Sequence, residues 1–173
     1  MSLLWLWVSM FASSEQLCRL KCLGAGFALA VLWFDLMFDV QVMDTAINGT
    51  APSVEALASI THYYKRITTD ASLGGIPMKA VVSAVFILFV TSSFLDLVQT
   101  QPFSARCRRF VALVFAVAPL AWAAVSIVPA AIELGQGTGS FDERSNLAVM
   151  ILTAHLVCLA SMSLFASLTV VGV

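Results

Sequence analysis

Charged residues are scarce in this sequence, and the two signs almost cancel. Only 11% of the residues are charged and the formal net charge is −1, which is well below the charged share of an ordinary soluble domain. There is no basic excess of the kind that marks a nucleic-acid-binding surface, so nucleic acid is not expected as a partner. Apolar residues make up 60% of the chain and the mean hydropathy is +0.95, so we expect the lipid bilayer to be its main partner.

Residues that bind metals are also few. The two histidines, His62 and His155, belong to different segments, and no two cysteines form a CxxC pair. We therefore predict no metal site from histidine and cysteine ligands, although a carboxylate-rich site stays open. The sequence contains no P-loop, HExxH, GxSxG or GxGxxG pattern, so no catalytic class is indicated and the cofactor stays unknown.

Four long apolar runs dominate what the sequence does contain. They cover about residues 20–42, 76–98, 110–134 and 147–171. Each is close to the roughly 20 residues that a helix needs to cross the hydrocarbon layer. The predicted fold is all-α, a four-helix transmembrane bundle in which residues 1–173 form a single integral membrane domain.

A polar segment between the first two spans is too hydrophilic to cross the membrane. Its apolar residues repeat at helical spacing over about residues 53–71, which predicts an amphipathic helix lying flat over one mouth of the bundle. Ser53 is the expected N-cap. The N-terminal Leu3–Trp7 segment, rich in leucine and tryptophan, is expected at the membrane surface or against a partner.

Small residues at four-residue spacing predict close helix contacts within lipid. The pairs are Gly24 with Ala28, Gly26 with Ala30, Ala154 with Cys158, and Ser163 with Ser167. Pro119 and Pro129 are expected to bend the third span, because each removes a backbone donor.

Basic residues suggest the orientation of the bundle. Arg19 and Lys21 precede the first span, and an Arg-rich loop (Arg106, Arg108 and Arg109) joins the second span to the third. The positive-inside rule then predicts both termini on the cytoplasmic or matrix side, in a plasma membrane or an organellar (mitochondrial) inner membrane. The sequon at Asn48 would face the other side.

Carboxylates inside the first span are the strongest anomaly of the sequence. Asp35 and Asp39 share one helix face, and Asp39 is near enough to the helix end to reach the membrane interface instead. His155 enters the fourth span from the same side to a depth similar to that of Asp35. With Glu133 at the end of the third span they form a predicted polar pocket. The predicted lid over this pocket is the run His62, Tyr63, Tyr64, Lys65 and Arg66.

Two interpretations of the pocket stay open. Buried ionisable groups that tune one another are typical of a site for a proton, a quinone-like molecule, a metal or a small polar substrate. Alternatively, an aspartate and a histidine form an interhelical hydrogen bond, worth about 1 kcal/mol, that fixes helix register.

Two segments carry a resemblance to other proteins. Residues 33–42 (WFDLMFDVQV) and 62–71 (HYYKRITTDA), followed by Pro77 and Met78, resemble a family of small four-span membrane proteins of bacteria and some eukaryotes. The resemblance implies that the aspartate pair and the Tyr-Tyr-Lys-Arg segment form one unit, but it supplies no reaction. In span count, and in a tyrosine-containing loop, the chain is also similar to small membrane proteins related to anthrone oxygenases.

The favoured functional hypothesis is a non-catalytic accessory or structural subunit of a larger membrane complex, of a respiratory or other energy-transducing kind. Its expected partners are other membrane subunits or further copies of itself. The alternative is a small membrane enzyme, or a protein that binds a cofactor or quinone through the Asp/His pocket.

Overall fold

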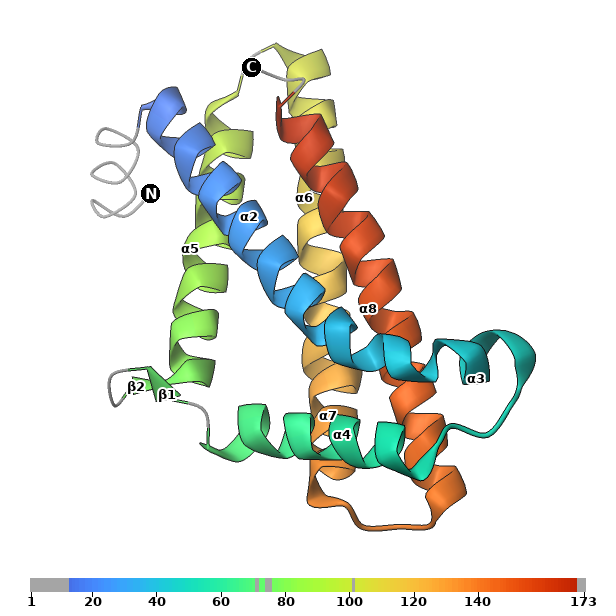
Figure 1. Ribbon diagram of the computed structural model, residues 1–173. Coiled ribbons are helices and arrows are strands. Elements are labelled where there is room, and N and C mark those ends of the chain that lie inside the picture. Colours follow the sequence, from blue (N-terminus) through green and yellow to red (C-terminus); the bar gives the residue numbers. More distant parts are fainter. Residues whose placement is uncertain (1–12, 71, 74–75, 101, 171–173) are drawn as a thin grey trace.

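Four long helical segments form the body of the protein (Figure 1). The computed structural model describes residues 13–70, 72–73, 76–100 and 102–170, so the prediction for Leu3–Trp7 lies outside the described residues. The segments are α2 (Ser14–Asp39), α5 (Met78–Gln99), α6 (Phe103–Trp122) with its continuation α7 (Val128–Gln136), and α8 (Phe141–Val170). All four are long and apolar enough to cross a membrane, which identifies an integral membrane protein and confirms the predicted all-α bundle.

Shorter elements connect α2 to α5. A 3-10 turn at Val40–Val42 leads into α3 (Met43–Asn48), and the amphipathic helix α4 (Val54–Lys65) continues as a π turn at Arg66–Asp70. Two short antiparallel strands, β1 (Ser72–Leu73) and β2 (Ile76–Pro77), follow. Figure 1 shows α4 running across one end of the bundle, as the sequence predicts for residues 53–71. We call this the α4 end; at the opposite end α2 begins and α8 finishes.

Local sequence signals explain where several helices begin and end. Ser53 accepts a hydrogen bond from the backbone N–H of Ala56 and so caps α4, as predicted. At the start of α2, Ser13 and Gln16 form a reciprocal capping box. Because α2 begins at Ser14, this span starts earlier than residue 20.

Small residues set two of the closest helix contacts. Gly24 and Ala28 are buried, and a Cβ on Gly24 would lie 2.6 Å from the ring of Phe89, so only glycine allows α5 this close to α2. The contact face at Ala154 and Cys158 is also buried, as predicted.

The predictions of close helix contact are wrong for two of the four residue pairs. Gly26 and Ala30 are exposed, and nothing lies within 4 Å of the position of a Gly26 Cβ. Ser163 and Ser167 are exposed too, and their hydroxyls donate to the backbone carbonyls four residues earlier in the same helix.

The third span, which is predicted to bend at Pro119 and Pro129, is interrupted between these two prolines. A π turn at Ala123–Ile127 separates α6 from α7. Proline has no N–H to bond the carbonyl of Phe115, and Ser161 of α8 donates its hydroxyl to that carbonyl instead, at 2.9 Å. This hydrogen bond ties α8 to the interrupted helix.

A candidate polar site beneath helix α4

His155 lies between the two carboxylates of the first span. Its Nδ1 is 2.7 Å from Oδ2 of Asp39, and its Nε2 is 3.7 Å from Oδ2 of Asp35. The first distance is a hydrogen bond, in which the imidazole donates if the carboxylate is ionised; the second is an ion-pair distance. The predicted meeting of α2 and α8 at these residues is therefore present in the structure.

The tyrosines of α4 complete this arrangement. Tyr63 donates its hydroxyl to Oδ1 of Asp35 at 2.5 Å, and Tyr64 donates to Oδ1 of Asp39 at 2.7 Å. We call the five residues Asp35, Asp39, Tyr63, Tyr64 and His155 the His155 network. All four carboxylate oxygens of the network face a partner within the chain, so three separate helices are joined by polar contacts.

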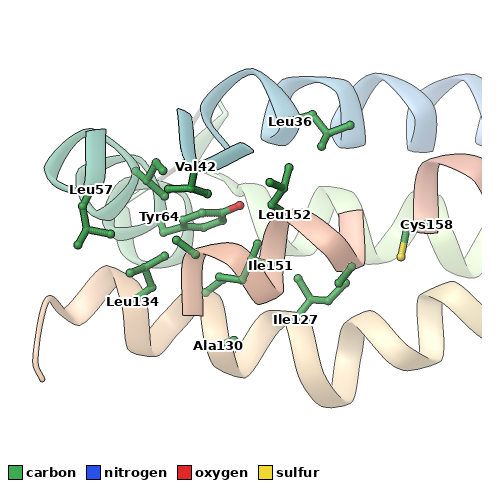
Figure 2. Close-up of a cluster of buried hydrophobic side chains, with 14 residues drawn as sticks. Leu36, Val42, Leu57, Tyr64, Ile127, Ala130, Leu134, Ile151, Leu152 and Cys158 are labelled. Carbon is green, nitrogen blue, oxygen red and sulfur yellow. The ribbon is translucent and has the colours of Figure 1, made fainter. Parts of the chain in front are cut away.

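A hydrophobic cluster surrounds the Tyr64 side of the network. Asp39 is fully buried, and Tyr64 is only 1% exposed. Figure 2 shows the Tyr64 ring among the apolar side chains of the cluster, with its hydroxyl oxygen pointing towards Leu152. Hydrogen bonds in such an apolar setting cost much to break, because the freed groups find no water.

The Tyr63 side is more open. Phe38 stacks on the Tyr63 ring, with 3.9 Å between centroids and 9° between planes. Tyr63 itself is half-buried, and the side chain of Asp35 is 14% exposed. The network therefore approaches the protein surface at Asp35 and Tyr63, whereas Asp39 and Tyr64 are enclosed.

Gly135 allows α4 to lie this close to the bundle. A Cβ on Gly135 would stand 2.8 Å from the backbone nitrogen of Lys65 and 3.0 Å from the carbonyl carbon of Tyr64. Backbone atoms cannot move aside as a side chain can, so a glycine is required in α7 at the crossing with α4. This contact sets the height of both tyrosines above the aspartates.

The tyrosine phenols hold their protons tightly. Burial is the largest cause that raises the pKa of Tyr63, followed by the charge of Asp35 and its hydrogen bond. Burial also comes first for Tyr64, and the carboxylates of Asp39 and Asp35 add to it. Both pKa values lie far above the ordinary phenol value, so both hydroxyls act as donors throughout the physiological range.

Several predicted members lie outside the network. Glu133 is exposed, and so are His62, Lys65 and Arg66 of the predicted lid. Only Tyr63 and Tyr64 of the lid contact the aspartates, because the helical repeat turns their neighbours outward. Glu133 follows the π turn in its helix, and the extra residue in that turn rotates every later side chain by about 100°.

A second polar cluster lies towards the opposite end, where the sequence has basic residues but predicts no buried partner for them. Asp96 of α5 is 4% exposed and accepts from Lys21 Nζ at 2.5 Å and from Arg109 Nη1. Lys21 is itself only 8% exposed. We call these three residues the Asp96 cluster. The sequence signal for the Asp96 cluster is the lone aspartate in the second apolar run. It lies at the same membrane depth as the basic residues near the first and third apolar runs.

Comparison of the chain with protein-family models, with curated proteins and with solved structures finds no match.

Proposed function

We propose that this integral membrane protein is a non-catalytic accessory subunit of a larger membrane assembly, and that the His155 network fastens α4 across the bundle. The observation that carries the proposal is the pairing of the network within the chain. Each carboxylate oxygen of Asp35 and Asp39 already faces a tyrosine hydroxyl or an imidazole nitrogen. A substrate would have to displace an internal partner before it could reach the fully buried Asp39, and it would compete with Tyr63 at Asp35.

A network of this kind favours a rigid surface. A buried polar group without a hydrogen-bond partner costs roughly 1–3 kcal/mol. Lifting α4 off the bundle would leave several groups of the network unpaired and would therefore incur this cost several times. The apolar side chains around Tyr64 add burial that is lost in the same movement. A helix held in this way presents a fixed polar face, including the exposed His62, Lys65 and Arg66, to a neighbouring subunit or to the aqueous side.

The orientation that we propose places both termini on the cytoplasmic or matrix side. Its support is that Arg19, Arg108 and Arg109 gather at the end of the bundle opposite α4. The α4 end, with Asn48, then faces the other compartment.

The test is extraction of native membranes with a mild detergent, followed by a native gel and detection of a tagged chain. A subunit is expected to migrate with a band far larger than a monomer or dimer, and its deletion should alter or remove that band. Migration of all the protein as a free monomer or dimer in several mild detergents would contradict the proposal.

A second candidate is a small membrane enzyme or a protein that binds a quinone-type molecule at the same network. The observation that favours it is the partial exposure of Asp35 and Tyr63, which leaves one approach to the network from the protein surface. Two carboxyls and one imidazole also change their charge when a proton is gained or lost.

The variant Asp35→Asn separates the two candidates. An accessory subunit with this change should still assemble and support growth, provided that the amide keeps the Tyr63 hydrogen bond. A catalytic or ligand-binding network should lose function while assembly is unchanged. Asp142→Asn, which changes an exposed aspartate at the α4 end, is the control for the loss of one charge.

A further inference from the structure

A cavity of about 430 Å³ opens between α2, α5, α6 and α8 at the end of the bundle opposite α4. It lies next to the Asp96 cluster and is separate from the His155 network. Four of its lining side chains are basic, namely Arg19, Lys21, Arg108 and Arg109. Two are acidic, Glu15 and Asp96, so the lining has a formal surplus of two positive charges (four minus two).

The pairing inside the cavity concentrates this surplus. Arg19 and Glu15 form an exposed ion pair at 2.5 Å, a contact that water screens and that an incoming phosphate can displace. Asp96 is shared by Lys21 and Arg109, so one carboxylate faces two cations. Because Lys21 and Asp96 are both buried, water screens this imbalance weakly. The Asp96 cluster, with two cations on one carboxylate, therefore brings one net positive charge to the cavity, close to the expected membrane surface.

The inner wall of the cavity is apolar. Ala112 of α6, with Phe165 and Leu168 of α8, lines it beside the basic residues. Phe165 and Ala112 both belong to a buried hydrophobic cluster, so this wall lies within the apolar part of the protein. A ligand that fits both parts of the lining has an anionic head and a hydrocarbon portion.

We propose that this cavity binds the head group of an anionic phospholipid. The phosphate lies against the arginine side chains, whose planar donors suit phosphate oxygens, and the glycerol and acyl portion follows the wall at Phe165 and Leu168. Basic pockets between transmembrane helices take such head groups. A free phosphate shares the anionic chemistry, but it makes no use of the apolar wall. The inference goes beyond the proposed function and stands whether or not the chain is a subunit.

The test uses the full-length protein, purified in a neutral detergent and depleted of lipid. Thermal unfolding is followed in three parallel additions: phosphatidylglycerol, phosphatidylcholine with the same acyl chains, and inorganic phosphate. Phosphatidylglycerol is expected to raise the melting temperature clearly more than phosphatidylcholine, since a ligand that binds the folded state stabilises it. Native mass spectrometry of the same samples should show phosphatidylglycerol retained on the protein.

Charge-removing variants locate the site. Lys21 and Arg109 hold Asp96, so the test avoids them and uses Arg19→Gln and Arg108→Gln, alone and together. The double variant should lose most of the extra shift caused by phosphatidylglycerol and most of the retained lipid. Lys65→Gln removes the same charge from an exposed position at the α4 end and should keep both.

Three results would overturn the proposal. Equal shifts with phosphatidylglycerol and phosphatidylcholine would show that the head-group charge is not recognised. A shift with inorganic phosphate alone as large as that with phosphatidylglycerol would assign the cavity to a soluble anion. If Lys65→Gln lost as much of the extra shift and of the retained lipid as the double variant, the effect would come from the overall protein charge rather than from a site. If the double variant unfolds in detergent, the single variants and the lipid retained by the unaltered protein still decide the question.

Discussion

Ionisation of the two tyrosines gives a direct optical test of the His155 network. The chain has only two tyrosines, and both donate to aspartates of the His155 network, so the whole tyrosinate signal comes from this site. A free phenol with a pKa of about 10 is roughly 90% ionised near pH 11. Burial and the neighbouring carboxylates raise the pKa of both phenols well above that value. We therefore expect almost no tyrosinate absorbance near pH 11 while the protein is folded.

The sign of the linked stability change follows from the same shift. A phenol whose pKa is raised by folding contributes its full stabilisation below the unfolded pKa of about 10, and this contribution falls as the pH rises above it. The protein should then unfold more easily with each step above that pH. When it unfolds, both tyrosines should ionise together in a single cooperative rise of absorbance.

The assay is absorbance near 295 nm during alkaline titration in detergent, with the denatured protein as the reference. Tyr63→Phe and Tyr64→Phe each leave one phenol, so each residue can be followed alone. In each variant the remaining phenol should stay un-ionised in the folded protein and ionise only as the protein unfolds, because burial raises its pKa. Titration of both phenols near the ordinary value in folded protein would refute the contacts proposed for α4.

Two further predictions concern packing and charge. Gly135→Ala should lower the free energy of unfolding by about 1–3 kcal/mol, because the added methyl group overpacks against the α4 backbone. Gly26→Ala places its methyl group in open space and should be neutral or stabilising by up to about 1 kcal/mol. Thermal unfolding of both variants in one detergent compares them. Equal effects of the two changes would count against the close approach of α4 and α7. Asp96→Asn leaves the buried Lys21 and the partly buried Arg109 without their carboxylate and should cost about 3–5 kcal/mol. Glu15→Gln at an exposed pair should cost about 0–1 kcal/mol. A small loss for both would mean that the Asp96 cluster is solvated.

The sequence predicted the spans because length and hydropathy decide which segments cross lipid. It also predicted that His155 and Asp35 lie close together, since depth from the same membrane side is readable from residue numbers. The hydrogen bond of His155, however, goes to Asp39, which is fully buried rather than at the interface. The cap at Ser53 is a local signal of the same kind.

Other features depend on how each helix is rotated about its axis, which single-sequence patterns leave open. The π turn rotates Glu133 away from the network, and nothing in that apolar segment marks where the extra residue enters. Gly24 and Gly26 have the same small-residue spacing, yet only Gly24 faces another helix. The pairing of Lys21 with Asp96 needs the contact of α2 with α5, so the lysine was expected at the membrane rim.

The protection of the buried face of α4 tests the central claim most directly. In a chain whose four native cysteines are replaced by serine or alanine, a single thiol is introduced by Ile60→Cys, on the fully buried face of α4, or by Ser59→Cys, on its exposed face. Labelling with a water-soluble maleimide should be much slower at the first position than at the second. Adding Asp39→Ala should remove that protection, and Asp142→Ala should leave it intact. Fast labelling of the Ile60→Cys thiol in the otherwise unaltered network would contradict the claim that the His155 network holds α4 against the bundle.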